Sequence, residues 1–492
     1  MNEKEGRGTV GKEECGTAEK EECGTVGKRG TRKAQSVVNA RALVLTMLLE
    51  LEGGQEYSNV ILQGTLLKYD YLSTQEKAFI KRLFEGCVEY RILLDYVLNA
   101  YSKTKTDQMK PVILEILRMG VYQLLYMDAV PDAAAINEAV RLAEKRGFHG
   151  LKGFVNGVLR TAARNRKALP MPDETGEPMA ALSVKYAMPE WLVCFFYEKY
   201  GISATQKMLA AMLSEKPVSI RMDERLSTEE RARVLERMRA RGIGVTRHPY
   251  LDYAYLLSGA DGVRNVPGFA EGAFYVQDVS SMLVSEAAGI REGMRILDVC
   301  AAPGGKSLHA AVKLHGTGMV ESRDLKEYKT AIIEENRMRC HCDNLTVRQQ
   351  DAVVLREEDV GQYDIVYADV PCSGLGIMGK KCDIRHRITP KQMEELAALQ
   401  RKILDTACAC VREDGVLIYS TCTINPAENE EQLPYLIAHG FAAESLDPYL
   451  PEVLWGETTK QGYLQLLPGI HETDGFFLAR LRKRTGRNGN SD

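Results

Sequence analysis

The chain has 492 residues and a formal net charge of −3, with 45% hydrophobic and 27% charged residues, as in an ordinary globular protein. At roughly 150 residues per domain, this length predicts about three domains. The near-neutral charge gives no nucleic-acid signature, so a nucleic-acid partner would have to be held by local basic surface. Apolar runs are too short to span a bilayer and the N-terminus lacks an apolar signal region, so we expect no membrane partner.

The cysteine pattern argues against a metal centre. None of the 12 cysteines belongs to a CxxC pair, and Cys340 and Cys342, like Cys408 and Cys410, are two residues apart. We interpret these as packed thiols rather than metal ligands, and we expect no metal. Thiols without a disulfide framework are typical of a reducing compartment, so a cytoplasmic location is expected.

Both terminal segments are predicted to be unfolded. Residues 1–35 repeat an octad, GTVGKEEC and then GTAEKEEC, with almost no large apolar side chains, and such a segment cannot offset its ordering entropy. Its basic end, residues 28–33, could contact RNA or form a solvated run of charge. Residues 485–492 are predicted to form a flexible tail.

Residues 36–167 have apolar side chains at helical spacing and no strand pattern, which predicts a compact all-α domain. We expect helices over several apolar runs: residues 41–50, 74–84, 111–125, 130–140 and 154–159. The opening at 41–46, the run 114–125 and the segments 136–140 and 154–160 resemble the NusB family of RNA-binding helical domains. That resemblance implies RNA contact, with the basic stretch 160–167 as the candidate surface. From its charges alone, this stretch is equally a solvated helix end.

Residues 168–268 predict a proline-containing linker and then a small, RRM-like α+β segment. We expect a helix that begins over residues 182–193, then a strand at 218–222, a helix at 227–241 and strands at 244–248 and 253–257. This segment is the most arginine-dense part of the chain, through Arg231, Arg233, Arg237, Arg239, Arg241 and Arg247. Glutamates dilute this charge, so an RNA-facing surface and a solvated charged face are both open.

Residues 269–484 alternate short apolar strands with helical stretches, which predicts an α/β Rossmann-like domain with a mostly parallel sheet. Strands are expected at residues 296–299, 318–322, 345–347, 363–369, 415–420 and 475–480. Helices are expected between residues 324 and 338, at 390–412 and at 428–438. In a sheet of this kind, ligands bind at the carboxyl ends of the strands.

The first of these strands leads into a glycine-rich turn and a helix. The turn consists of Cys300, Ala301, Ala302, Pro303, Gly304, Gly305 and Lys306. It matches neither the GxGxxG fingerprint nor a phosphate-binding GxxxxGK[ST] loop. Asp324, just after the second strand, suits a ribose diol. Together these features favour an adenosine ligand without a polyphosphate, such as S-adenosylmethionine, over a purely structural glycine turn.

Two cysteines lie directly after predicted strands, Cys372 within residues 369–376 and Cys422 within residues 420–430. Both segments are rich in turn-forming residues, so a chemical role is favoured over buried packing. A thiolate that adds to carbon 6 of a pyrimidine makes carbon 5 nucleophilic enough to take a methyl group. Asp369 could support ring nitrogen 3 of a cytosine, and a second thiol could remove the proton from carbon 5.

The same stretches carry a second resemblance. Residues 298–306, 369–374, 420–430, 274–281 and 474–480 are similar to the RNA cytosine-5 methyltransferases of the Nop/Sun group, which have a class I methyltransferase fold. With a NusB-like domain in front, the chain resembles the bacterial enzymes that form 5-methylcytosine in 16S rRNA, which implies the cytosine at position 967 as the target. The resemblance implies S-adenosylmethionine as cofactor and 16S rRNA as partner, and we expect a monomer.

The resemblance also implies roles for the residues around the cofactor. The loop at residues 300–306 would wrap S-adenosylmethionine, Asp324 would bind its ribose, and Asp351 would lie beside its adenine. Asp369 would lie where the cofactor meets the target base.

By the same resemblance, Cys422 is the nucleophile and Cys372 helps to release the methylated product. The sequence departs from the family pattern at two places. Val370 replaces the more usual alanine, and residues 378–385 depart from the usual Arg-x-Pro-Asp pattern. These departures concern the substrate loop rather than the reaction.

Other functions remain open from the sequence. The same chemistry could act on tRNA, 23S rRNA or DNA. A non-enzymatic RNA-binding or antitermination factor, led by the NusB-like part, would leave the cofactor loop without a use. Methylation of a protein side chain would leave the two cysteines unexplained.

Overall fold

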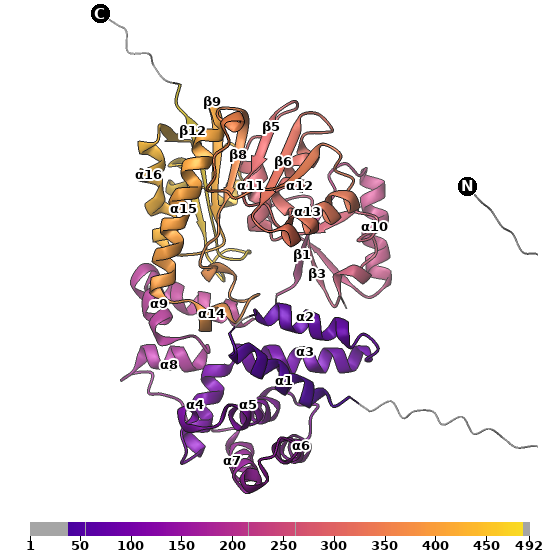
Figure 1. Ribbon diagram of the computed structural model, residues 1–492, viewed down its shortest axis with the longest axis vertical. Helices are drawn as coiled ribbons and strands as arrows, with labels where there is room; N and C mark the ends of the chain where they lie inside the picture. The colour runs from indigo at the N-terminus through magenta and orange to yellow at the C-terminus, as the bar shows by residue number, and fades with distance from the viewer. Residues whose placement is uncertain (1–37, 55, 215, 261, 486–492) are drawn as a thin grey trace, which may run out of the picture. The chain divides into compact units, whose positions relative to one another are not determined.

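The computed structural model describes residues 38–485 except 55, 215 and 261 (Figure 1). The predicted tails, residues 1–35 and 485–492, lie outside the described residues but for residue 485. From Ala40 onward the described chain forms one unit with a helical part, a small antiparallel sheet and a large mixed sheet. No described helix is both long enough and apolar enough to cross a membrane.

The helical part has no strand among its described residues, as predicted. Its helices are α1 (Ala40–Glu52), α2 (Ser58–Lys68), α3 (Thr74–Glu89), α4 (Arg91–Tyr101), α5 (Pro111–Tyr126), α6 (Asp132–Lys145) and α7 (Lys152–Asn165). Ser73 starts α3 because its side chain accepts a hydrogen bond from the backbone N–H of Glu76. Pro111 starts α5, since proline fits the first helical turn. Helices α2 and α4 were not predicted.

Helix α5 lies at the centre of this part, as its nearly continuous apolar sequence suggests. Its Leu117 is fully buried. Gly86 of α3 lies so close to the ring of Tyr122 that an added Cβ would come within 1.9 Å of it. Gly120 similarly makes room for Leu159 of α7. Small residues therefore allow α3 and α7 to pack tightly on the central helix.

Residues 178–276 form a small ferredoxin-like layer, in agreement with the predicted α+β segment. Its elements are α8 (Pro178–Lys185), α9 (Glu190–Leu213), β1 (Val218–Met222), α10 (Thr228–Ala240), β2 (Gly244–Arg247), β3 (Ala254–Ser258) and β4 (Phe274–Val276). The strands pair antiparallel in the order β2-β3-β1-β4. Strand β4 lies beyond residue 268, within the segment that the sequence grouped with the Rossmann-like part.

A helix was predicted to begin within residues 182–193 with Pro189 near its first turn, and α9 does begin there, but the structure has a separate helix before it. Helix α8 ends at Lys185, and α9 begins only at Glu190. Between them Ala187 has a positive φ of 47°, and Pro189 takes the position that precedes the first turn of α9. Proline disfavours a helical conformation in the residue before it, so the apolar run is divided between two helices.

The large sheet is eight-stranded, with the order β10-β12-β9-β8-β5-β6-β7 and β11 paired to β12. Its strands are β5 (Arg295–Asp298), β6 (Met319–Asp324), β7 (Leu345–Gln349), β8 (Tyr363–Asp369), β9 (Val411–Thr421), β10 (Phe441–Ala443), β11 (Tyr463–Leu466) and β12 (Phe476–Lys483). Strands β5 to β9 are parallel, and β12 runs antiparallel to β9, β10 and β11.

Helices cover both faces of this sheet. They are α11 (Val279–Ala287), α12 (Gly305–Lys313), α13 (Glu327–Arg339), α15 (Pro390–Cys410), α16 (Leu433–Ala438) and α17 (Glu457–Lys460). The short helix α14 (Ile384–Arg387) instead packs beside α9 through Ile384. Ile296 of β5 belongs to an apolar cluster with α11 and α12, whereas Leu297 belongs to a cluster with α15. Neighbouring strand residues point to opposite faces, which explains why the parallel strands read as continuous apolar runs.

The helix expected at residues 428–438 begins later than predicted. Two short 3-10 turns, Pro426–Glu428 and Glu430–Gln432, precede α16. Asn429 has the backbone angles φ −121° and ψ −110°, which no helix contains. The side chains of Glu428 and Asn429 are buried, because they bond to the loops that carry the two cysteines.

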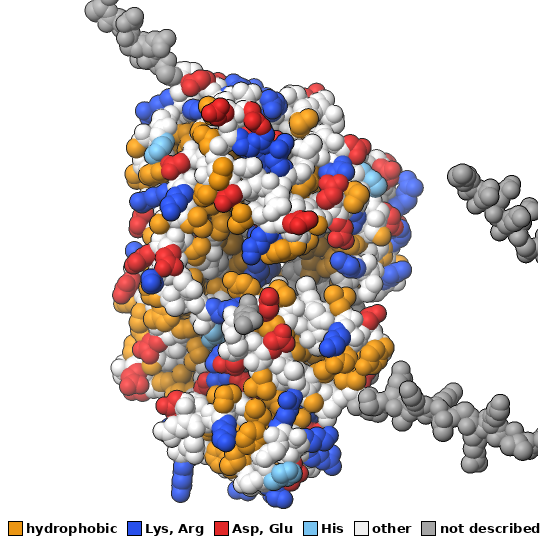
Figure 2. All heavy atoms as spheres, viewed as in Figure 1, with side chains coloured by type: hydrophobic (Ala, Val, Ile, Leu, Met, Phe, Trp, Pro, Cys, Tyr) orange, Lys and Arg blue, Asp and Glu red, His pale blue; other side chains and the backbone are white. Residues whose placement is uncertain are grey.

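The strand order places the candidate site. Strand β5 lies between β6 and β8. Strands β6 and β7 are added on one side of β5, and β8 and β9 on the other, so the strand order reverses at β5. Ligands bind at such a switch point. The carboxyl ends of β5, β6, β8 and β9 meet at one edge because these strands are parallel. Figure 2 shows a hollow between the α/β part and helix α2, whose position can be followed in Figure 1.

Candidate active site

The glycine-rich turn after β5 brings backbone rather than side chains to the sheet edge. Gly304 has φ 104°, a conformation that favours glycine, and its N–H donates to the carbonyl of Ala301 at 2.7 Å. A Cβ at Gly305 would lie 3.1 Å from the ring of Tyr275. Helix α12 begins at Gly305, so its free N–H groups face the turn.

Two carboxylates support this turn. Asp324, at the end of β6, accepts a hydrogen bond from the N–H of Ala302 at 3.2 Å. Asp298, at the end of β5, is buried and accepts a hydrogen bond from Ser307 at 2.6 Å. Burial raises the pKa of Asp298 to about 7. Its buried Oδ1 atom has no hydrogen-bond partner among the described residues.

An ion pair links the turn to the neighbouring strand. Lys306 Nζ lies 2.6 Å from Asp369 Oδ2, and Asp369 Oδ1 accepts a hydrogen bond from Ser420 at 2.8 Å. Burial works against the charge on Lys306, but the adjacent carboxylate outweighs it and raises the pKa of Lys306. A protonated amine is thus held at the carboxyl ends of β5 and β8.

The two cysteines that follow β8 and β9 come into direct contact. Cys372 Sγ and Cys422 Sγ are 3.3 Å apart. The S–H of Cys372 as donor, together with Lys381 and Lys306 nearby, lowers the pKa of Cys422 below its usual value, although burial and Asp369 oppose this. The same contact raises the pKa of Cys372. Cys422 is therefore the thiol that ionises first.

A buried glutamate joins the two cysteine loops. Glu428 is fully buried, and its carboxylate accepts hydrogen bonds from the backbone N–H of Ser373 at 2.9 Å and from the hydroxyl of Ser373 at 2.5 Å. Gln400 donates to it at 3.0 Å and Asn425 at 2.9 Å. Ser373 directly follows Cys372, so Glu428 fixes the spacing of the two thiols. No role for Glu428 was predicted; the run of Asn and Glu directly after a strand was the available signal.

A second charged group, also missed from the sequence, lies beside this edge. Lys380 Nζ is 2.8 Å from Asp278 and 2.6 Å from Asp474, and Lys216 Nζ is 3.0 Å from Asp474. Despite burial, Lys380 lowers the pKa of Asp278 to about 2. These residues come from four distant segments, and only the fold shows that they belong together.

Proteins of a known family match this chain in sequence over nearly its whole length. It is 34% identical over 460 residues to the probable ribosomal RNA small subunit methyltransferase B of Bacillus subtilis, a match that covers 91% of this chain and 99% of the relative. The chain belongs to the ribosomal RNA small subunit methyltransferase B (RsmB) family. The Synechocystis relative is 31% identical over 456 residues, covering 91% of this chain and 100% of its own length, and bears the same probable assignment.

Family models account for the three parts of the fold. The family model described as "16S rRNA methyltransferase RsmB/F" matches residues 287–482. The model of the NusB family matches residues 38–164, and the model of the ferredoxin-like domain of RsmF/B-like methyltransferases matches residues 188–264. The predicted resemblance to NusB proteins and to RNA methyltransferases is confirmed.

Solved structures share the fold. PH0851 superposes with a TM-score of 0.75 at 21% identity and covers 91% of this chain and 99% of its own. NSun6 from Pyrococcus horikoshii superposes with a TM-score of 0.54 at 22% identity, over 61% of this chain and 99% of its own.

The structure brings most of the predicted site residues to one edge of the sheet. The turn from Cys300 to Lys306, Asp324, Asp369, Cys372 and Cys422 all follow or end neighbouring parallel strands. Asp351 differs, because it is exposed after the outer strand β7 and its carboxylate accepts a hydrogen bond from the N–H of Val353 at 3.0 Å. Its adenine-binding role stays a prediction.

The predicted RNA surfaces are basic and exposed. Arg233, Arg237 and Arg239 are exposed on α10, and Arg237 pairs with Glu271 at 3.1 Å. In the stretch 160–167, Arg166 pairs with Asp132 of α6 at 2.9 Å. Both surfaces retain acidic neighbours, and their contact with RNA stays a prediction.

The remaining cysteines behave as packed thiols. Cys340, Cys342, Cys408 and Cys410 are buried and free. Burial raises the pKa of Cys342 to about 11. Within the part of the chain that the structure describes, no group of three or more His, Cys, Asp or Glu side chains is placed to hold a metal.

Proposed function

We propose that the protein transfers a methyl group from S-adenosylmethionine to carbon 5 of a cytosine in 16S rRNA, the cytosine at position 967 by resemblance. The observation that carries the proposal is the contact of 3.3 Å between Cys372 and Cys422 beside the Lys306–Asp369 pair. Membership of the RsmB family supports the rRNA substrate.

The turn after β5 fits the proposed cofactor. Glycine at residues 304 and 305 leaves the backbone open at the start of α12, and any side chain there would meet Ile333 or Tyr275. The unpartnered Oδ1 of Asp298 offers an acceptor for an ammonium group, and Asp324 offers a carboxylate for a ribose. Bound there, S-adenosylmethionine supplies an electrophilic methyl group.

In the first step, the Cys422 thiolate attacks carbon 6 of the cytosine. The S–H of Cys372, with Lys381 and Lys306, lowers the pKa of Cys422 and so favours the thiolate, although burial and Asp369 oppose this. Attack places negative charge on the ring. The protonated Lys306, paired with Asp369 at 2.6 Å, can supply the hydrogen bond that supports ring nitrogen 3. Carbon 5 then has the electron pair that it needs to take the methyl group.

In the second step, a base removes the proton from carbon 5. While Cys422 is a thiolate, its charge keeps the neighbouring Cys372 protonated. Once the Cys422 sulfur is bonded to carbon 6, that charge is gone and the pKa of Cys372 falls, so Cys372 can pass its proton to solvent, although burial and Glu428 still oppose its ionisation. The Cys372 thiolate then takes the proton from carbon 5, and the carbon–sulfur bond breaks with its electron pair returning to Cys422.

Covalent trapping tests this function. Wild type, Cys422→Ala and Cys372→Ala are incubated with S-adenosylmethionine and 16S rRNA, 23S rRNA or tRNA, and the products are run on denaturing gels. We expect a persistent adduct with 16S rRNA only for Cys372→Ala, and none for Cys422→Ala. Cys194→Ala, which removes a thiol of α9, is the control. An adduct that requires Cys372 alone, or one formed with another RNA, would overturn the assignment.

A further inference from the structure

Strand β1 of the ferredoxin-like layer carries a buried cation whose hydrogen-bond partners are neutral oxygens. Arg221 is 4% exposed. Its Nη1 donates to Oε1 of Gln277 at 2.6 Å and to the backbone carbonyl of Gly305 at 2.9 Å. No carboxylate among the described residues forms an ion pair with it, and the carboxylate of Glu224 nearby pairs with Lys313 at 3.4 Å instead.

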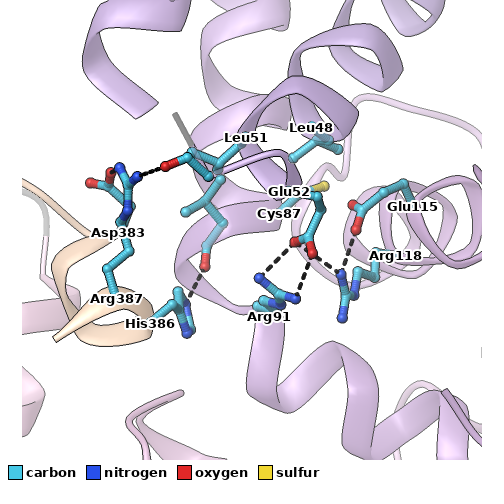
Figure 3. Close-up of a pocket in the computed structure, with 12 residues that line it drawn as sticks. Leu48, Leu51, Glu52, Cys87, Arg91, Glu115, Arg118, Asp383, His386 and Arg387 are labelled. Atoms are coloured by element: carbon cyan, nitrogen blue, oxygen red, sulfur yellow. Dashed lines mark hydrogen bonds and ion pairs between the residues drawn. The ribbon is translucent and has the colours of Figure 1, made fainter. Parts of the chain in front are cut away.

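A buried arginine of the helical part shows the more usual arrangement. Arg118 of α5 lines a cavity of about 190 Å³ and points toward the carboxylates of Glu52 and Glu115 (Figure 3). Asp95 lies 2.7 Å from its Nη2. Burying a charge costs free energy unless nearby groups compensate it, and an amide and a carbonyl compensate less than carboxylates do. Stability alone therefore gives little reason for a cation at Arg221.

Two neighbouring strands of the small sheet hold the cofactor turn, residues 300–306. Tyr275 of β4 lies opposite Arg221 in the register of β1 and β4, so the two side chains are on one face of the sheet. The hydroxyl of Tyr275 donates to the carbonyl of Pro303 at 3.1 Å. Arg221 holds the carbonyl of Gly305, two residues further along the turn. Two carbonyls of the turn are thus fixed by the ferredoxin-like layer.

The layer also packs closely against the start of α12. A Cβ at Gly305 would lie 3.1 Å from the ring of Tyr275 and 3.4 Å from Cδ of Gln277. The guanidinium of Arg221 lies 5.8 Å from the centre of the Tyr275 ring. The backbone of the turn can approach these side chains only because residue 305 is glycine.

A fixed carbonyl also fixes the N–H group of the same peptide. In a trans peptide the N–H points away from the carbonyl, so the bond from Arg221 to Gly305 sets the direction of the N–H of Lys306. The N–H groups of Gly305 and Lys306 belong to the first turn of α12, where no carbonyl of the helix precedes them as an acceptor. They are therefore donors for a ligand at the carboxyl end of β5.

We propose that the ferredoxin-like layer supports cofactor binding: Arg221 and Tyr275 hold the carbonyls of Gly305 and Pro303, and so position the first N–H groups of α12 for S-adenosylmethionine. Both are positioning residues, since they act through the backbone of the turn. The inference rests on the proposed function in taking S-adenosylmethionine as the ligand of the turn. It gives the layer a role in addition to any contact with RNA.

Calorimetric titration of the full chain with S-adenosylmethionine, without RNA, tests the proposal. Arg221→Met keeps a long side chain but removes its charge and its donors. It should raise the Kd by about ten-fold, because the peptide that follows Gly305 loses its fixed direction. Arg221→Lys keeps a charge and a donor but not the planar fork of the guanidinium, so its Kd should lie within about three-fold of that of wild type.

Arg480→Met is the matched control. Arg480 is also buried, and its Nη1 donates to the carbonyls of Ala287 and Ala288 at 2.7 and 2.8 Å, at the end of α11 rather than in the turn. Its Kd should stay within about two-fold of that of wild type. Steady-state methylation of 16S rRNA gives a second readout: Arg221→Met should raise the KM for S-adenosylmethionine by about ten-fold and change kcat by less than about three-fold.

Each outcome decides the proposal. A Kd unchanged by Arg221→Met, an equal rise with Arg480→Met, or a loss of kcat at constant KM overturns it. If Arg221→Met fails to fold, Tyr275→Phe serves instead, because it removes only one hydroxyl. Asn336 also donates to the carbonyl of Pro303, at 3.2 Å, so Tyr275→Phe should raise the Kd by only about three-fold, and an unchanged Kd overturns the proposal.

The same titration separates this proposal from the proposed function. Wild type that binds S-adenosylmethionine but does not methylate 16S rRNA would reject only the proposed function, and the Kd values of the variants would still decide the role of the ferredoxin-like layer. Wild type that binds no S-adenosylmethionine would reject both.

Discussion

The loops that carry Cys372 and Cys422 look equivalent in the sequence but differ in electrostatic character. Each follows a parallel strand and places a thiol at the same edge of the sheet. Cys422 is close to the ammonium groups of Lys306 and Lys381, whereas Cys372 is close to the carboxylate of Glu428. Two thiols in contact therefore acquire opposite tendencies to ionise. The difference in pKa between the two thiols therefore comes from their neighbours.

The largest effect should come from removing the thiol that ionises. Cys422→Ala should reduce methyl incorporation into 16S rRNA by roughly 10³-fold or more, since loss of a covalent nucleophile removes the whole pathway. Incorporation of labelled methyl from S-adenosylmethionine measures it. Unchanged binding of S-adenosylmethionine would show that the fold of the site survives. Residual activity within ten-fold of wild type would contradict the assignment of Cys422.

Cys372→Ala should affect the first methyl transfer little but should slow steady-state turnover strongly. The first methyl transfer should still occur, because Cys422 keeps its two lysines. Turnover should fall by about 10²-fold, since proton transfer from carbon 5 then depends on water. A comparison of single-turnover and steady-state rates measures the difference. Equal loss in both would show that Cys372 acts before methyl transfer, through its S–H bond to Cys422.

Glu428→Gln should uncouple the two loops. The amide places N–H groups against donors from Ser373, Gln400 and Asn425, so we expect a loss of about 2 kcal/mol in the free energy of unfolding. The urea midpoint of the α/β part measures this loss. Glu431→Gln is the matched control, because Glu431 is nearby but exposed. A midpoint as high as that of the control would mean that Glu428 does not join the loops.

The smallest effect is a difference in pH dependence between the thiols of the unmodified protein. The pKa of Cys422 is lowered, so its thiolate should persist to lower pH than that of an ordinary cysteine. The pKa of Cys372 is raised, so its thiolate should appear only at higher pH. Alkylation of the two peptides in one sample, from pH 6 upward, should show Cys422 reacting first. The reverse order would exchange their proposed roles.

Local patterns were sufficient to predict much of the fold. The apolar run of β8 was predicted with the bounds Tyr363–Asp369 that the structure has, because a buried parallel strand shows its character in every residue. A helix that begins near Pro189 was predicted, but the separate helix α8 before it was not, because the hydrophobicity of the run is continuous. Residues 428–438 were predicted as one helix because the inward bonds of Glu428 and Asn429 join residues far apart in the chain.

The sequence by itself determined which reactive groups follow the strands. These are a glycine-rich turn between a strand and a helix, a carboxylate at the second strand, and one thiol after each of two further strands. These features are local, since turn residues and apolar periodicity act over a few positions. The tertiary structure decided which thiol ionises, that Glu428 joins the two loops and that Arg221 holds the cofactor turn. Coulombic and hydrogen-bond contacts depend on distance in space, and Arg221 and Gly305 are 84 residues apart in the chain.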